Sequence, residues 1–175
     1  MKKVILFIAC SIDGYIADLN DDLSFLSLVE KEGEDYGYND FINSVDTVLI
    51  GRRTYDKVLT LVPTFPHADK ETFVITRTPR ESIGKTIFYT GALPSLVNDL
   101  KSRPGKNIFV DGGAKLVNEL LKHTLIDEMI ISTIPVLLGN GIKLFQQELP
   151  ESKWKLISQK SFDTGLTQVH YSRIS

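Results

Sequence analysis

The sequence has a single cysteine, little net charge and no long apolar run, and each of these shortages excludes a class of protein. Cys10 has no second cysteine with which to form an internal disulfide, so nothing implies an oxidising compartment and we expect a cytoplasmic location. The formal net charge is −2, and lysines and arginines form no run among aromatic residues, which argues against a nucleic-acid partner. No stretch approaches the ~18 apolar residues of a membrane span, so we expect no membrane partner.

The first residues are the one feature that argues for export. Lys2 and Lys3 precede an apolar run, residues 4–10, in the manner of a secretion signal. The run is at the lower limit of about 7 residues for such a signal, and it passes directly into residues 11–14, which read as a strand end followed by a turn. We therefore interpret it as the first strand of a folded domain.

The length and composition predict one globular domain. A chain of 175 residues is long enough for one compact core and too short for two ordinary ones, so we expect a single domain over residues 1–175. Six short apolar runs have the pattern of parallel strands buried on both faces: residues 4–9, 47–50, 72–75, 86–89, 108–110 and 129–134.

Helical patterns fall between several of these strands. The clearest is Ala114–Lys122, in which an apolar stripe of Leu116, Val117, Leu120 and Leu121 lies opposite Lys115, Asn118, Glu119 and Lys122. We expect Ser95 to cap a second helix, a third helix to start near Arg53, and a fourth, interrupted by glycine, over residues 35–44.

The carboxyl-terminal part changes character. Residues 154–161 and 166–174 alternate like two half-exposed antiparallel strands around a turn at residues 163–165. The sequence as a whole predicts an α/β fold with three layers: a mostly parallel central sheet, helices on both of its faces, and an antiparallel hairpin at the end of the chain.

Two predicted strand-to-helix turns carry glycine. In residues 46–55, Gly51 would let an anion approach the main-chain N–H groups of a helix start, and Arg52 and Arg53 are suited to phosphate. In residues 108–114, Gly112 and Gly113 would expose main-chain amides in a way that suits a pyrophosphate. Solvated arginines and a tight connection explain the same residues, and neither turn is a Rossmann motif or a P-loop.

Two further segments follow predicted strands at the same edge of the sheet, where open α/β folds bind their ligands. Thr76 and Arg77 follow residues 72–75 and suit a 2′-phosphate, although a surface turn closed by Pro79 explains them almost as well. Asp13 follows the first strand and would orient a substrate or relay a proton, although Asp-Gly is also an ordinary turn.

Other chemistries find less support. His67, His123 and His170 have no companion spacing typical of zinc, so we expect no metal. Cys10 sits inside an apolar run, which favours an inert buried thiol over a nucleophile.

Taken in order, these segments resemble the dihydrofolate reductase superfamily, and specifically a stand-alone relative of the C-terminal reductase domain of the bifunctional riboflavin-biosynthesis deaminase/reductase. The resemblance covers nearly the whole chain. It is carried by residues 11–17, 46–55, 111–114, 125–128 and 135–145.

The resemblance implies that the protein binds NADPH. It implies Gly51, Arg52, Arg53 and Thr54 at the phosphates, Thr76 and Arg77 near the adenosine 2′-phosphate, Gly112, Gly113 and Ala114 at the pyrophosphate, and Ala9 and Ile16 beside the nicotinamide. In this family Gly112 and Gly113 can be joined by a cis peptide, and Asp13 would face the substrate.

The departures from the family concern the substrate. Tyr15 stands where the riboflavin-pathway domain usually has a basic residue, and residues 23–44 do not match its serine and arginine pattern for substrate binding. Asp35 and Asp40 are the available substitutes for the acidic pterin-binding residue of dihydrofolate reductases. The resemblance therefore implies a reductase without naming its substrate.

We hypothesise hydride transfer from NADPH to a C=N or C=O bond of a small heterocyclic, pterin- or pyrimidine-like, or carbonyl substrate. Two alternatives stay open. One is an NADP(H)-binding module without turnover. The other is a mainly dimeric interaction protein, since the apolar residues 134–138 suit self-association and relatives are commonly homodimers.

Overall fold

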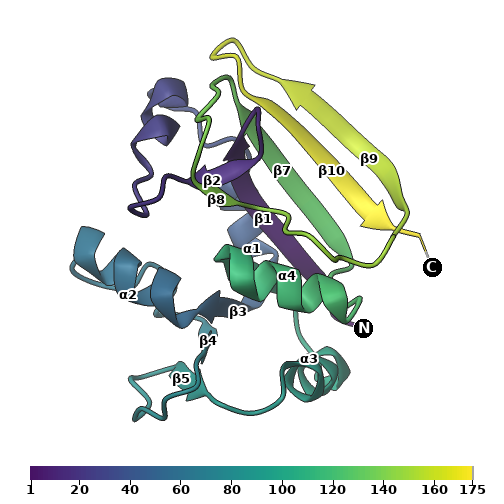
Figure 1. Ribbon diagram of the computed structural model, residues 1–175. Coiled ribbons are helices and arrows are strands. Elements are labelled where there is room, and N and C mark those ends of the chain that lie inside the picture. The colour runs from purple at the N-terminus through teal and green to yellow at the C-terminus, as the bar shows by residue number, and fades with distance from the viewer. Residues whose placement is uncertain (175) are drawn as a thin grey trace.

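The computed structural model describes residues 1–174 and shows a twisted sheet with helices on both faces (Figure 1). The strands are β1 (Val4–Ser11), β2 (Tyr15–Ala17), β3 (Val45–Gly51), β4 (Glu71–Ile75), β5 (Thr86–Tyr89), β6 (Asn107–Gly112), β7 (Glu128–Ile134), β8 (Ile142–Lys143), β9 (Trp154–Ser161) and β10 (Thr167–Arg173). The helices are the 3-10 helix η1 (Ser24–Val29), α1 (Tyr38–Asn43), α2 (Arg52–Leu61), α3 (Leu93–Ser102) and α4 (Ala114–Lys122).

The main sheet has eight strands in the order β5-β4-β3-β6-β1-β7-β10-β9. The pairs from β5 to β7 are parallel, and the last two pairs, which contain the C-terminal hairpin, are antiparallel. β2 and β8 form a separate antiparallel pair beside it. The predicted fold class, a mostly parallel α/β sheet that ends in an antiparallel hairpin, is confirmed.

The two faces of the sheet have separate cores because successive strand residues point to opposite sides. On one face, Leu6 of β1 packs in a cluster with Val97 of α3 and Val117 of α4. On the other, Ile5 packs with Phe41 of α1, and Tyr55 of α2 closes a third cluster over Ile50. The central parallel strands are covered on both faces, as their continuous apolar runs predict.

Two details of the helices differ from the prediction. α3 is preceded by Ala92 and not capped by Ser95, because Pro94, which has no N–H to satisfy, occupies its first turn. Asn118 was expected on the polar face of α4 but is buried. Its Nδ2 donates to the carbonyls of Ala114 and Leu144, both at 2.7 Å, so the asparagine ties the helix to the segment after β8.

The fourth predicted helix is shorter than residues 35–44. Asp35 accepts hydrogen bonds from the N–H groups of Gly37 and Asn39, and Gly37 is left-handed with φ 79°, so α1 starts only at Tyr38. The apolar segment 134–138 is also less free than expected. Ile134 is 1% exposed in the core, and only Leu137 among its large apolar residues is widely exposed.

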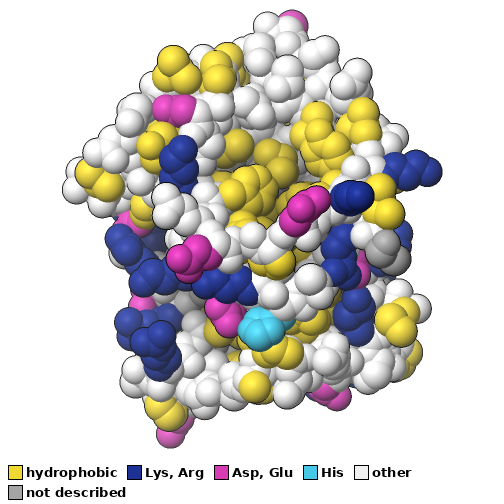
Figure 2. All heavy atoms as spheres, turned by 45° about the vertical axis from the view of Figure 1, so that its right-hand side comes forward, with side chains coloured by type: hydrophobic (Ala, Val, Ile, Leu, Met, Phe, Trp, Pro, Cys, Tyr) yellow, Lys and Arg dark blue, Asp and Glu magenta, His cyan; other side chains and the backbone are white. Residues whose placement is uncertain are grey.

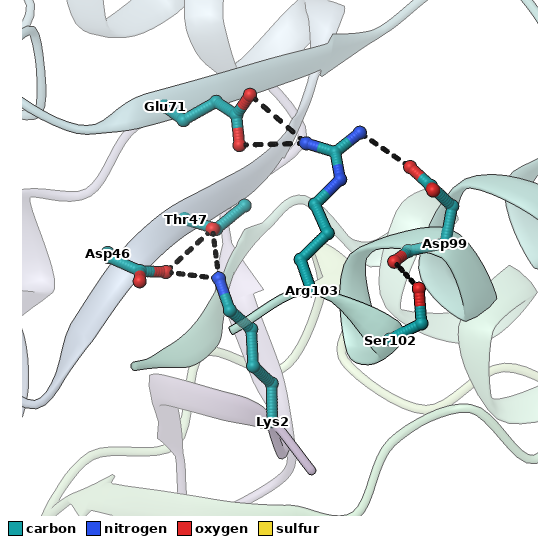
Figure 3. Close-up of polar contacts among 7 residues, drawn as sticks. All are labelled: Lys2, Asp46, Thr47, Glu71, Asp99, Ser102 and Arg103. Carbon is teal, nitrogen blue, oxygen red and sulfur yellow. Dashed lines mark hydrogen bonds and ion pairs between the residues drawn. The ribbon is translucent and has the colours of Figure 1, made fainter. Parts of the chain in front are cut away.

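The amino-terminal edge of the sheet is closed by ion pairs (Figure 3). The buried Lys2 donates to Asp46 Oδ1 at 2.7 Å and to Thr47 Oγ1 at 3.3 Å. Arg103, just after α3, bridges Glu71 of β4 and Asp99 of α3. These side chains hold one edge of the sheet together and leave the opposite, carboxyl edge for a site. Along residues 1–174, no helix has the length and apolar character needed to span a membrane.

Candidate functional site

The two predicted glycine turns meet at the carboxyl edge of the sheet. β3 ends at Gly51 and β6 at Gly112, and Ile50 is in register with Gly112. A Cβ placed on Gly51 would lie 3.6 Å from both the carbonyl oxygen of Gly112 and the nitrogen of Gly113. The peptide that joins Gly112 to Gly113 is cis. Gly51 and Gly112, which are 61 positions apart in the chain, therefore form one surface.

Two helices start from this surface. Gly51 is the N-cap of α2 and Gly113 the N-cap of α4, and neither helix has a side chain that caps its first N–H groups. Main-chain N–H groups without a cap need an acceptor, and a helix N-terminus favours an anionic one. Thr54, in the first turn of α2, places its Oγ1 only 2.7 Å from where a Cβ on Gly113 would stand, so any side chain at Gly113 would force Thr54 to move.

The arginines differ in their surroundings. The exposed Arg53 donates from Nε and Nη2 to Asp21 Oδ2, at 2.9 and 2.5 Å, and so reaches the loop between β2 and η1. Arg52 and Arg77 are exposed, and neither makes a side-chain hydrogen bond or ion pair with residues 1–174. Arg77 follows β4, whose last residue, Ile75, pairs with Gly51, so it stands one strand along from the first turn.

Thr76 is occupied locally. It is 9% exposed, and its Oγ1 lies 3.1 Å from the N–H of Thr78, which donates to it. This closes the turn before Pro79. Thr76 therefore shapes the turn, and Arg77 is the residue of these two that has a charge available for a ligand.

Asp13 connects two loops. Its carboxylate accepts hydrogen bonds from Ser11 Oγ at 2.5 Å, from the N–H of Leu138 at 3.1 Å and from that of Gly139 at 2.7 Å. The bond from Ser11, and then those from Gly139 and Leu138, lower the pKa of Asp13 to about 2. A carboxylate that is ionised at neutral pH and engaged at both oxygens is suited to positioning a loop, and it holds no proton to relay.

A cavity of about 610 Å³ opens on the face of the sheet that carries α1 and η1. Phe7 and Ala9 of β1 and Ser132 of β7 form its floor, and Leu26 and Tyr38 stand at its sides. The volume is in the usual range for small-molecule sites. Of the two residues expected beside a nicotinamide, Ala9 lines this cavity, whereas Ile16 packs against the core of the other face.

Three polar side chains, of which the middle one is buried, lie between this cavity and the glycine turns. Tyr38 Oη lies 3.4 Å from Nε2 of His67, and that nitrogen lies 3.6 Å from Oδ2 of Asp111, the residue before Gly112. His67 is 5% exposed. Burial, together with the charge of Asp111, raises the pKa of Tyr38 to about 12, so the phenol keeps its proton at neutral pH and remains a hydrogen-bond donor.

This cavity was not predicted from the sequence, and His67 was considered there only as a zinc ligand, for which it has no companion spacing. The lining comes from β1, η1, α1, β7 and the segment between η1 and α1, and no local motif marks it. One sequence signal was available: the run of acidic residues 30–35, which lies at the cavity. Among residues 1–174, no three His, Cys, Asp or Glu side chains are grouped as metal ligands would be.

The mostly parallel sheet with helices on both faces has a dihydrofolate-reductase-like α/β fold. A dihydrofolate reductase from Enterococcus faecalis, solved with NADP(H), superposes with a TM-score of 0.66 over 99% of this chain and 97% of its own, at 14% identity. At that identity the likeness concerns the fold alone.

The chain belongs to the family of the RibD C-terminal domain, whose model matches residues 2–168. A Bacillus subtilis protein, uncharacterised YwjB, is 42% identical over 173 residues, 98% of each chain. A putative riboflavin biosynthesis protein from Shewanella sp. PV-4 has a TM-score of 0.90 and 32% identity over 99% of both chains. The Thermotoga maritima deaminase/5-amino-6-(5-phosphoribosylamino)uracil reductase has a TM-score of 0.74 at 18% identity. The match covers 99% of this chain and 57% of that protein.

Proposed function

We propose that the protein is a single-domain, NADPH-dependent reductase that transfers a hydride to a C=N or C=O bond of a small heterocyclic, pterin- or pyrimidine-like, or carbonyl substrate. The observation that carries the proposal is the meeting of two uncapped helix N-termini at Gly51 and Gly113, with a partly buried row of polar side chains leading from that surface to a cavity lined by Ala9. Family membership supports the same reaction class.

The cofactor residues of the proposal lie along the carboxyl edge of the sheet. Gly51, Gly112, Gly113 and the N–H groups that open α2 and α4 would hold phosphates, beside Arg52, Arg53, Thr54 and Ala114. Arg77, with Thr76 shaping its turn, would bind the 2′-phosphate. Ala9 and Ile16 would stand nearest the nicotinamide. NADPH supplies the hydride when bound.

The chain's own residues orient the substrate in this proposal. Tyr38 and Ser132, which both carry hydroxyl groups, line the cavity, and Phe7 gives it an aromatic surface against which a planar ring can lie. Asp13 holds the loop at Leu138 and Gly139 in place. The proton that accompanies the hydride would come from another group than Asp13, because the carboxylate is ionised at neutral pH.

Calorimetric titration with NADPH and, in parallel, NADH tests the cofactor assignment. We expect NADPH to bind at least tenfold more tightly, since charge-assisted hydrogen bonds to one added phosphate are worth about 1.5–3 kcal/mol. Arg77→Ala should remove most of that preference. Gly51→Ala is the matched test of the turn: a Cβ there meets only ordinary contacts, so the fold should tolerate it while NADPH binding weakens. If neither cofactor binds, the reductase proposal fails.

The second function is an NADP(H)-binding module without turnover. The ionised, fully engaged carboxylate of Asp13 favours it, because the residue first expected to relay a proton is committed to a loop. NADPH oxidation, followed with a panel of pterins, pyrimidines and small carbonyl compounds, separates the two functions. Tight NADPH binding with no oxidation across the panel would support the module.

The proposal includes a cytoplasmic homodimer. A hollow of about 270 Å³ is lined by Leu121, Phe145 and Trp154, and Leu156 and Ile157 of the same strand as Trp154, β9, are 47% and 51% exposed. Figure 2, which turns the β9 side of the molecule forward, shows apolar side chains gathered around a hollow. Light scattering at micromolar concentration should give twice the mass of one chain, and Leu156→Lys should halve it. A monomeric wild type would remove this part of the proposal.

A further inference from the structure

Negatively charged side chains predominate at the mouth of the cavity on the α1 face. Four carboxylates line it, all from the segment between η1 and α1: Glu30, Glu32, Glu34 and Asp35. The only lysine or arginine of the lining is Lys31, and its ammonium group is paired with Asp163 of the β9–β10 turn. No lining residue therefore offers a free cation to a phosphate group.

The carboxylates differ in how firmly they are held. Asp35 accepts hydrogen bonds from the N–H groups of Asn39 and Gly37, which lower its pKa, and Glu34 Oε1 accepts one from the N–H of Tyr36 at 2.8 Å. Glu30 and Glu32 are exposed and make no side-chain hydrogen bond or ion pair within residues 1–174. The fold therefore holds the carboxylates of Glu34 and Asp35 in place, whereas those of Glu30 and Glu32 make no bond within residues 1–174.

The floor of the cavity holds a buried donor. Ser132 is 4% exposed, and its Oγ accepts a hydrogen bond from Gln168 Nε2 at 3.0 Å. The same Nε2 also donates to the carbonyl of Tyr36 at 3.1 Å. No group within residues 1–174 accepts the hydrogen of the Ser132 hydroxyl, although such a hydroxyl has one donor to satisfy. A ring nitrogen or carbonyl oxygen of a ligand would satisfy it.

The Ser132 hydroxyl at the floor and the carboxylates at the mouth would contact opposite ends of a ligand in the cavity. A floor with one hydroxyl donor and an aromatic wall suits a planar heterocycle with an acceptor atom. A cleft mouth lined by charges of one sign attracts the opposite charge and repels its own, and such a repulsive element is a common source of specificity. A phosphate attached to the ring through a sugar would have to pass or remain at this mouth.

We infer that the cavity takes small planar heterocycles that carry a hydrogen-bond acceptor and are neutral or cationic, and rejects those that carry a phosphate. The inference rests on the proposed function for the reaction and specifies the substrate class. It sets this chain apart from its Thermotoga maritima relative, whose described substrate is a phosphoribosylamino uracil.

The test uses a matched pair of probes, 5-amino-6-(5-phosphoribosylamino)uracil and the same compound without its phosphate. Calorimetry on the wild-type protein, with and without NADPH, should show at least tenfold tighter binding of the compound without phosphate. In the double variant Glu30→Gln/Glu32→Gln the ratio of the two affinities should fall at least threefold, because the phosphorylated probe binds more tightly. Raising the salt concentration should shrink it too, since exposed charges are screened.

A control variant, Glu81→Gln/Glu151→Gln, removes two exposed carboxylates that do not line the cavity and should leave the ratio unchanged. Equal or tighter binding of the phosphorylated probe by the wild type, or no binding of either probe, would overturn the inference. Selective binding of the unphosphorylated probe by a protein that does not bind NADPH would keep the ligand class and remove the reductase function instead.

Discussion

Gly113 is the residue at which two motifs from distant parts of the chain are fitted together. Its backbone is not left-handed, so alanine is acceptable in conformation, but the new Cβ would lie 2.7 Å from Thr54 Oγ1. Overpacking of this kind costs about 1–3 kcal/mol. We expect Gly113→Ala to lower the free energy of unfolding by that amount in urea titrations.

The matched control for this prediction removes the obstacle. Thr54→Ala/Gly113→Ala should recover most of the lost stability, because the oxygen that meets the new Cβ is gone. Equal destabilisation of the single and double variants would show that something other than Thr54 requires glycine at this position.

Asp13 gives a prediction about pH at the same scale. Its folded pKa, about 2, lies below the ordinary value of 3.8, so its hydrogen bonds stabilise the folded state fully above 3.8 and are lost as the pH falls through about 2. The amide proton shifts of Leu138 and Gly139, followed by NMR, should therefore titrate together with a midpoint near 2. A midpoint near 3.8 would mean that the carboxylate does not hold this loop in solution.

Among the elements, α2 and the loop after β2 are joined by a contact that competes with the proposed cofactor. Arg53 donates two hydrogen bonds to Asp21, and the carboxylate thereby occupies a side chain that the family resemblance assigns to phosphate. We expect Asp21→Asn to tighten NADPH binding about threefold to tenfold at low salt, which corresponds to roughly 0.7–1.4 kcal/mol.

A double-mutant cycle separates this competition from a general change in charge. In an Arg53→Ala background, Asp21→Asn should leave NADPH affinity nearly unchanged, because the arginine that would be released is absent. The same increase in both backgrounds would assign the effect to the field of Asp21 and not to its bond with Arg53.

The elements differ in how far they could be predicted from local sequence. The central strands were predictable because burial on both faces leaves continuous apolar runs, as in residues 47–50, and the hairpin because half-exposed strands alternate. The role of Asn118 was not predictable, since its partners include Leu144, 26 residues away. Pro94 indicated the start of α3, but the prediction gave weight to Ser95 instead.

The same distinction applies to the candidate site. Turns at Gly51 and Gly112–Gly113 have a local cause, a strand end followed by a helix start, and the sequence predicted both. That they touch follows from the order β3-β6-β1, which no local pattern encodes. The cavity depends on Ala9 and Ser132 being neighbours across β1 and β7, a register that exists only in the folded sheet.

At the scale of the whole molecule, the two edges of the sheet differ in whether their polar groups are bonded within the protein. The carboxyl edge presents uncapped helix N–H groups, together with Arg52 and Arg77, which have no side-chain partner within residues 1–174. The amino edge is closed by side chains that bond to one another (Figure 3). Burial raises the pKa of Asp46, but bonds from Lys2, the N–H of Lys106 and Thr47 outweigh it, and the net pKa is lowered. In Glu128, bonds from Lys3 and His170 likewise outweigh burial and lower the pKa.

Both carboxylates therefore make the protein sensitive to acid as a whole. Their stabilisation is present above their ordinary pKa values of 3.8 and 4.5 and is lost as the pH falls through the lower folded values. Asp46→Asn leaves the buried Lys2 without its counter-ion, and since Asp46 itself is partly exposed we expect a loss of about 1–3 kcal/mol at pH 7.

Urea titrations across pH test this origin of stability. The difference in the free energy of unfolding between the wild type and Asp46→Asn should be largest at neutral pH. It should disappear as Asp46 takes up a proton, because the wild type then also lacks the negative charge. Asp69→Asn is the control: its carboxylate is 72% exposed and only 3.5 Å from Lys70, so the variant should stay within about 0.5 kcal/mol of the wild type at every pH. If the difference in the free energy of unfolding stays the same below the folded pKa of Asp46, the lost stability comes from packing and not from the ion pair with Lys2.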